Sequence, residues 1–352
     1  MQQDSIEKGG KPAFIGEKRK FAGKDYEKTV QGWKPIATER KVKDEKTDDA
    51  PKVGAWWKEM NLPPLNGYPV NIPKADVTIN LEGDIHSHAV MIWKDPKTKV
   101  IKRAYTKEFM DRNAQVKWSR MAKVDSKQID NIKKKSSNLL SSSDSKTREA
   151  AAIINIIAQT GLRRGNRGKF EITGNRGVST LAPDSITIEG DKINFSFVGK
   201  SYKDNKAFVK DAKLAKFLGD LQKQRKGQEY LFDTTDATID STFEQVGGKG
   251  LHIKDMRTYV ASDLATKILF EDSSTPPPLP PDLSVPKQKK LIKDKLNDCY
   301  KKVSDLLNNS PTMAKNSYIH PNIIDEWIKT LNASFEVVKG EDSSYLYSMK
   351  DE

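Results

Sequence analysis

The stretch Ser145–Asn166, SKTREAAAIINIIAQTGLRRGN, decides the fold of the larger part of the chain. Its apolar residues recur at the spacing that places them on one face of a helix: Ala150, Ile153, Ile154 and Ile157. Ser145 can cap the start of this helix, and Gly161 marks its expected end. The stretch therefore predicts an amphipathic helix followed by a loop with two adjacent arginines, Arg163 and Arg164.

A three-stranded sheet and more helices are expected after this loop. The three β-favouring runs lie at 185–189, 193–198 and 207–209, and Gly190–Asp191 forms the first turn. Helical patterns resume at about 211–224, 239–246, 253–270, 287–307 and 321–335. The proline-rich segment 275–286 is predicted to be a stiff loop, because proline lacks a backbone donor and fixes φ. The sequence thus predicts a mostly α-helical domain over 146–340 and a C-terminal tail over 341–352.

A second, smaller domain is predicted upstream. Short β-favouring runs at 77–80, 89–93 and 99–103 indicate a meander, and two helical patterns follow at about 106–121 and 125–140. We assign 51–138 to this domain and the serine-rich segment 139–145 to a hinge. Residues 1–50 carry nearly balanced charges without a sustained apolar period, so they are expected to form a charged, disordered arm. The predicted fold class is α+β.

Charge and composition limit the possible functions. The 352 residues include 61 Lys and Arg against 48 Asp and Glu, a formal charge of +13 that favours a polyanionic partner such as DNA, RNA or an anionic membrane. The chain has no run of about 18 apolar residues that could span a bilayer and no apolar signal segment at its start. Its single cysteine, Cys299, excludes an internal disulfide and a thiolate metal site, and indicates a reducing compartment.

Four scattered elements of the helical domain could carry chemistry: Thr160–Asn166, Gly199-Lys200-Ser201, Lys254–Thr258, and Asn309–Pro311 followed by Tyr318–Pro321. Taken alone, each element also fits a purely structural role without any catalytic function. Arginines at a helix end can neutralise terminal carbonyls or pair with surface acids, and a lysine at a hairpin tip is usually solvated. An isolated tyrosine most often packs in a core or an interface.

Taken together, the order and spacing of these elements resemble the type IB DNA topoisomerase family, in the poxvirus-like and bacterial branch of the tyrosine recombinase–topoisomerase superfamily. The resemblance covers roughly 145–325, and the segment 51–138 is similar, more weakly, to the family's DNA-clamping domain. The motif blocks that carry it are Thr160–Asn166, Gly177–Leu181, Ile188–Asp191, Phe197–Ser201, Lys254–Tyr259, Asn309–Pro311 and Ser317–Pro321.

The resemblance implies six catalytic residues: Tyr318, Arg163, Lys200, Arg257, Asn309 and Lys254. Tyr318 would be the nucleophile that forms a 3′-phosphotyrosyl bond, and the two arginines would neutralise the phosphoryl group as it becomes pentavalent. Lys200 would protonate the departing 5′-oxygen, helped by Lys254. Asn309 stands where part of the family has histidine, and an amide can donate a hydrogen bond but carries no charge.

The resemblance also implies a setting for this chemistry: relaxation of supercoiled DNA without ATP, metal or cofactor. The partner would be double-stranded DNA clamped by a monomer, in the cytoplasm or nucleoid or in a virus. Lys133-Lys134-Lys135 and Lys287–Lys295 are candidate phosphate contacts or, alternatively, solvated helix faces. His86-Ser87-His88 could seat a metal, but two histidines without a third ligand more often form a surface turn.

Two other functions remain open at this point. A tyrosine recombinase or integrase would use the same chemistry, although recombinases usually have an H-x-x-R arrangement where this chain has Lys254-x-x-Arg257. A non-catalytic DNA-binding protein on this fold would keep the basic surface and lose Tyr318, Lys200 or an arginine. All of these residues are present.

Overall fold

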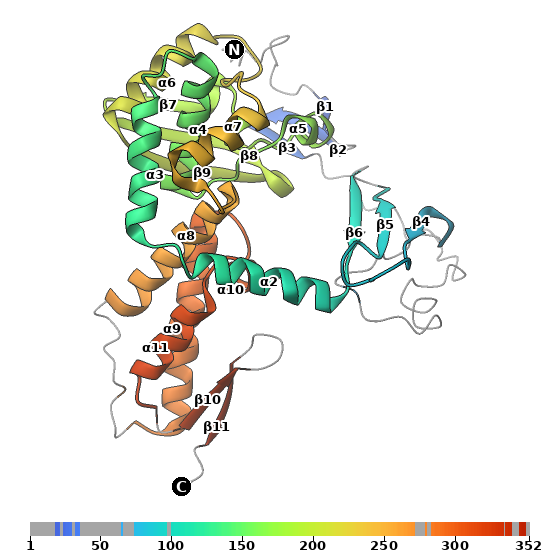
Figure 1. The fold of residues 1–352 in the computed structure, drawn as a ribbon, viewed down its shortest axis with the longest axis vertical. Coiled ribbons are helices and arrows are strands. Elements are labelled where there is room, and N and C mark those ends of the chain that lie inside the picture. Colours follow the sequence, from blue (N-terminus) through green and yellow to red (C-terminus); the bar gives the residue numbers. More distant parts are fainter. Residues whose placement is uncertain are drawn as a thin grey trace. The chain divides into compact units, whose positions relative to one another are not determined.

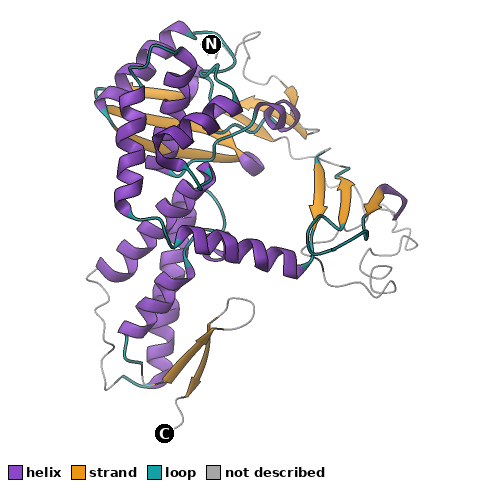
Figure 2. Cartoon of the chain, viewed as in Figure 1, coloured by secondary structure: helices purple, strands orange, loops and turns teal. Residues whose placement is uncertain are grey.

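The computed structural model describes residues 18–21, 24–29, 32–35, 65, 74–96, 100–271, 279, 283–333, 335–339 and 345–349. The chain divides into two compact units: Met1–Ser119 with Arg167–Gly174, and Arg120–Asn166 with Asn175–Glu352. The division falls at Ser119, so the segment 139–145 that was predicted as a hinge lies within the second unit. Helices and small antiparallel sheets make up the described chain, which confirms the α+β class (Figure 2).

The first unit contains a sheet that the sequence did not predict. Its strands β1 (Lys18–Phe21), β2 (Lys24–Thr29) and β3 (Gly32–Pro35) pair antiparallel within the segment expected to be a disordered arm (Figure 1). Only two residues separate successive strands, the spacing of tight hairpins. The prediction was wrong because these short, charged strands lack the apolar alternation that marks a half-buried strand.

The predicted meander is confirmed in the same unit. Strands β4 (Val77–Ile79), β5 (Met91–Lys94) and β6 (Ile101–Ala104) form an antiparallel sheet before helix α2 (Lys107–Met121). Its small core consists of Leu65, Val77, Val90, Met91 and Ala104, and Trp93 packs against it. Trp118 is half-buried, whereas Trp56 and Trp57 lie outside the described residues. A short helix, α5 (Arg167–Thr173), also belongs to this unit and was not predicted.

Helix α4 (Ser145–Thr160) is the centre of the second unit. All of its residues from Glu149 to Ala158 are buried, and it packs against α3 (Ser126–Leu139), α7 (Asp236–Phe243) and α8 (Ile253–Thr266). The N-cap is Asp144, whose carboxylate accepts from the Thr147 amide, rather than the predicted Ser145. Gly161 ends the helix in the left-handed conformation, at φ 66°.

The predicted sheet lies beside this helix. Strands β7 (Ile186–Glu189), β8 (Lys192–Gly199) and β9 (Lys203–Lys210) form an antiparallel sheet in chain order, followed by helix α6 (Ala212–Gln224). One face buries Ile193, Phe195 and Val209 in the core around α4. Strand β9 is longer than predicted, so the β8–β9 hairpin extends to Lys200 at its tip.

The C-terminal part of the second unit has its own core. Helices α9 (Val285–Leu307), α10 (Pro311–Ser317) and α11 (Pro321–Thr330) are followed by strands β10 (Phe335–Lys339) and β11 (Tyr345–Met349). Trp327 is fully buried in the apolar cluster that α8, α9 and α11 share. Helix α10 is too short to show a periodic pattern and was not predicted, and β11 occupies part of the predicted tail. The proline-rich segment lies mostly outside the described residues, and α9 begins at its end.

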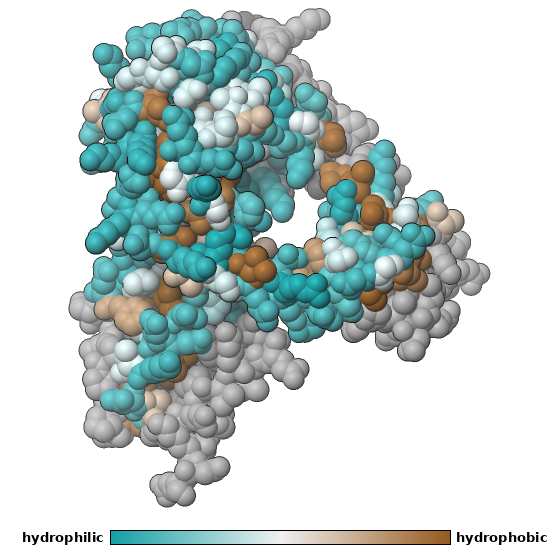
Figure 3. Space-filling model, viewed as in Figure 1, coloured by the Kyte–Doolittle hydropathy of each residue, from teal (hydrophilic) through white to brown (hydrophobic). Residues whose placement is uncertain are grey.

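Hydrophilic residues cover much of the described surface in the space-filling view (Figure 3). Among the described helices, none combines the length and the apolar composition that crossing a bilayer requires.

A close backbone approach fixes the loop that follows α4. The carbonyls of Arg163 and Arg164 accept hydrogen bonds from the amides of Val178 (2.8 Å) and Ser179 (2.6 Å). A Cβ atom on Gly177 would lie 2.5 Å from the Gly165 nitrogen and 2.7 Å from the Arg163 carbonyl oxygen. The Gly177–Leu181 motif therefore positions the backbone of the arginine loop, and glycine is required at its start.

We expect Gly177→Ala to destabilise the second unit by about 1–3 kcal/mol, the usual cost of forcing an extra carbon into a packed site. The matched control is Gly219→Ala on α6, where the nearest atom to a new Cβ is 3.6 Å away. This control should be neutral or slightly stabilising, because alanine favours helix. Urea unfolding followed by circular dichroism measures both, and equal stability of the two variants would contradict the assignment.

Candidate active site

The two adjacent arginines after α4 have different surroundings. Arg164 is neutralised: its guanidinium lies 2.8 Å from an Asp236 oxygen and 2.6 Å from an Asp240 oxygen. Arg163 makes no ion pair within the described part of the chain, and its Nη1 donates to the Tyr318 hydroxyl at 3.3 Å. Arg164 therefore pairs with acidic residues and has a structural role. The charge of Arg163 is not paired with a carboxylate among the described residues, and it lies beside Tyr318.

Arg257, in the second turn of α8, is almost fully buried, with 3% of its surface exposed. Its Nη1 donates to the Gly161 carbonyl at 2.5 Å and its Nη2 to the Leu307 carbonyl. These carbonyls lie at the C-terminal ends of α4 and α9, where the helix dipole places partial negative charge. No described residue partners the buried Nε of Arg257, so part of the guanidinium's hydrogen-bonding capacity is unused.

Tyr318 follows α10 and lies between these cations. The Arg257 guanidinium carbon is 5.0 Å from the centre of the Tyr318 ring, and Arg163 contacts the hydroxyl. Burial alone would raise the pKa of Tyr318, but the charges of Arg163 and Arg257 and their hydrogen bonds outweigh it, so this pKa is lowered. The two cations therefore make the phenolate, the nucleophilic form of a tyrosine, easier to form than in a free tyrosine.

Arg257 stays charged in this environment at neutral pH. Burial and the nearby charge of Arg163 lower its pKa to about 10, while Tyr318 opposes that shift. The site thus holds two positive charges against one ionisable phenol.

Asn309 lies in the turn between α9 and α10. The backbone amide of Asn309 donates to the Ser304 carbonyl at 3.0 Å. The Nζ of Lys203 on β9 donates to the backbone carbonyl of Asn309 at 3.4 Å. Both side-chain polar atoms, Oδ1 and Nδ2, are buried without a hydrogen-bond partner among the described residues. Such groups are normally paired in a folded protein, so the side-chain amide of Asn309 has unused hydrogen-bonding capacity.

The two candidate lysines lie at the surface. Lys200 is exposed in the turn at the tip of the β8–β9 hairpin, which reaches the Asn309 turn through Lys203. Lys254 is exposed in the first turn of α8, and it forms no ion pair or hydrogen bond with other described residues. The structure thus brings Tyr318, Arg163 and Arg257 into contact, whereas the roles of both lysines stay predictions.

An ion pair that the sequence did not indicate anchors the start of α8. Asp255 is fully buried, and its carboxylate accepts two bonds from Arg120, at 2.8 Å and 3.2 Å, and one from the His252 amide at 2.9 Å. It stands two residues before Arg257, so it fixes the helical turn that carries the buried guanidinium. The two partners are 135 residues apart, and no local pattern could have revealed the contact.

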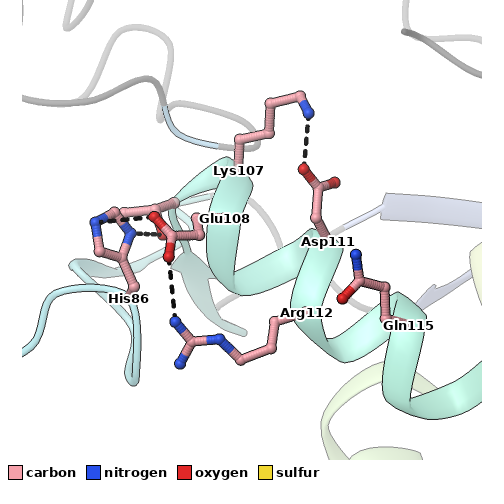
Figure 4. Close-up of a pocket in the computed structure, with 7 residues that line it drawn as sticks. His86, Lys107, Glu108, Asp111, Arg112 and Gln115 are labelled. Atoms are coloured by element: carbon pink, nitrogen blue, oxygen red, sulfur yellow. Dashed lines mark hydrogen bonds and ion pairs between the residues drawn. The ribbon is translucent and has the colours of Figure 1, made fainter.

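A pocket in the first unit is separate from this site. His86, Thr106 and residues of α2 line it, and they bind one another (Figure 4). His86 Nδ1 lies 2.8 Å from Thr106 Oγ1, and its Nε2 lies 3.4 Å from Glu108. No cluster of three or more metal-binding side chains occurs among the described residues, and His86-Ser87-His88 forms a surface turn.

The family model described as the catalytic core of eukaryotic DNA topoisomerase I matches residues 105–342, a range that includes all six candidate residues. No curated protein sequence matches the chain.

Two similar solved structures are crystal structures of the XerH site-specific recombinase bound to difH substrate. The pre-cleavage complex has a TM-score of 0.35 and 14% identity, covering 55% of this chain and 49% of the other. The post-cleavage complex has a TM-score of 0.38 and 14% identity, covering 58% and 51%. The chain spans about half the length of these recombinases.

The two arginines after α4 give a test of the electrostatics. Arg163→Ala should raise the pKa of Tyr318, because it removes one cation and one hydrogen bond from the hydroxyl. Arg164→Ala should leave it unchanged, since two carboxylates already balance that charge. NMR titration of tyrosine labelled at ¹³Cζ, with Tyr318 assigned by Tyr318→Phe, measures both. An equal shift in the two variants would refute the distinction.

Proposed function

Since this chain belongs to the family of the DNA topoisomerase I catalytic core, we propose that it relaxes supercoiled DNA by breaking and rejoining one strand. The observation that carries the proposal is the position of Tyr318, with its hydroxyl 3.3 Å from Arg163 and its ring 5.0 Å from Arg257. A tyrosine with a lowered pKa between two unneutralised arginines suits attack on a phosphodiester.

The proposed reaction is a reversible transesterification. The Tyr318 hydroxyl gives its proton to water and its oxygen bonds to the scissile phosphorus. At the same time the bond from phosphorus to the 5′-oxygen breaks, and Lys200 donates a proton to that oxygen. The broken strand keeps its 3′-phosphate on the tyrosine and gains a free 5′-hydroxyl. Swivelling of the DNA relieves torsion, and attack by that hydroxyl restores the strand. The phosphodiester energy is held in the tyrosyl bond, so no ATP is consumed.

The arginines would stabilise the pentavalent phosphoryl group. Guanidinium groups bind non-bridging oxygens strongly because their planar N–H donors match the oxygens in geometry and charge. Removing one preorganised donor of this kind typically costs about 10²–10³ in rate. The unpartnered amide of Asn309 supports a further, uncharged hydrogen bond to the same group.

Double-stranded DNA is the partner that this reaction requires. A formal charge of +13 suits a polyanion, and exposed lysines such as Lys134, Lys135, Lys287 and Lys290 can contact phosphates. We propose that a monomer clamps the duplex, with the small N-terminal domain as one half of the clamp.

A tyrosine recombinase is the second candidate, since it would share this chemistry. Lys254 in the K-x-x-R arrangement and the Ser317–Pro321 motif favour the topoisomerase, as does the family match. Plasmid substrates separate the two functions, because a recombinase needs two defined sites and a topoisomerase does not.

We expect the wild-type protein to relax positively and negatively supercoiled plasmid in EDTA without ATP, and Tyr318→Phe to lose this activity. The phenylalanine variant keeps the ring and removes only the nucleophilic oxygen. Agarose gels measure relaxation, and denaturant added during the reaction should trap protein on the 3′ side of the nick. Attachment at the 5′ end, or relaxation by Tyr318→Phe, would contradict the mechanism.

Lys200→Ala should slow strand cleavage by about 10²–10⁴, the usual contribution of a general acid. A substrate with sulfur in place of the 5′-bridging oxygen should recover most of that rate, because a thiolate leaves without a proton. Lys206→Ala, which removes an exposed lysine from the same hairpin, is the matched control and should cleave both substrates at the wild-type rate. Failure of the sulfur substrate to restore cleavage would exclude Lys200 as the acid.

A further inference from the structure

One serine hydroxyl joins α8 to the backbone on both sides of Ile319. Ser262 Oγ donates to the Tyr318 carbonyl at 3.2 Å and accepts from the His320 amide at 3.0 Å. Ser262 is half-buried and stands five residues after Arg257 on the same helix.

The chain needs such a bond at this place because it leaves one helix and enters another. Tyr318 ends α10 with φ −130° and ψ −31°, and Pro321 begins α11. The amides of Tyr318 and Ile319 both donate to the Ala314 carbonyl, at 3.1 Å and 3.0 Å. The buried Ile319 side chain anchors the link in the core.

We propose that Ser262 is a positioning residue that holds Tyr318 against Arg163 and Arg257. The effect of Ser262 on the cleavage rate rests on the proposed function. Helix α8 then supplies both the cation beside the phenol ring, through Arg257, and the bond that fixes the tyrosine backbone, through Ser262. A nucleophile about 1 Å out of place can lose about 10²-fold in rate, so one hydroxyl is enough to matter.

A pair of isosteric variants isolates the hydroxyl. Ser262→Thr keeps it, and Ser262→Val has nearly the same shape as threonine and lacks it. The matched control is Ser136→Ala on α3, which removes a buried serine hydroxyl that bonds only to the Lys133 carbonyl, outside the site. Its cleavage rate and its Tyr318 pKa should be those of the wild type.

Two measurements are made on each full-length variant. The first is the single-turnover rate of covalent adduct formation on a duplex that the wild type cleaves, together with DNA affinity by fluorescence anisotropy. The second is the pKa of Tyr318 by ¹³C NMR without DNA. Ser262→Val should cleave about 10- to 100-fold more slowly at unchanged affinity, and its Tyr318 pKa should rise as the phenol leaves the arginines. Ser262→Thr should retain the wild-type pKa and most of the rate.

The outcomes separate this inference from the proposed function. If Ser262→Val matches the wild type in both measurements, or if threonine and valine impair the protein equally, Ser262 is not a positioning residue. If wild type forms no adduct with any DNA while the Tyr318 pKa still depends on the hydroxyl, the proposed reaction is wrong and the positioning role stands.

Discussion

The arrangement of the candidate site depends on the burial of the Arg257 guanidinium among helix ends. Removing a charge from water costs several kcal/mol unless polar groups replace the solvent. Here the replacements are the carbonyls of Gly161 and Leu307, at the C-terminal ends of α4 and α9. One side chain of α8 therefore joins the ends of two other helices, and the loops that carry Arg163 and Asn309 both begin at these ends.

The kind of partner decides what each arginine can do. Carboxylates neutralise Arg164 and Arg120, so these two stabilise the loop after α4 and the start of α8. Arg257 is held by uncharged carbonyls, and Arg163 by the hydroxyl of Tyr318. Their charges therefore remain uncompensated among the described residues and act on Tyr318, whose pKa they lower against the effect of burial.

Much of this fold could be predicted from periodic patterns, whereas most of the positioning contacts could not. Helix α4 and strands β7–β9 have apolar residues at helical and alternating spacing, and both predictions were confirmed. The two arginines after Gly161 are equivalent in sequence, and only tertiary packing brings Asp236 and Asp240 to one of them. The hydrogen bonds from Arg257 to Gly161 and Leu307, and those of Ser262, involve backbone atoms, which every residue has. The residue types of these partners therefore could not reveal the contacts.

Asn309, two residues after the Leu307 carbonyl that holds Arg257, has an uncharged side chain. The resembling family has histidine at this position in some members, and an imidazole changes its charge near neutral pH. An amide has no such transition. Among the described residues, the charges that lower the pKa of Tyr318 are those of Arg163 and Arg257. The pKa of Arg257 is about 10, well above neutrality, so that charge is constant across the physiological range. The pKa of Tyr318 is therefore set by burial, which raises it, and by these two cations, which lower it below its ordinary value.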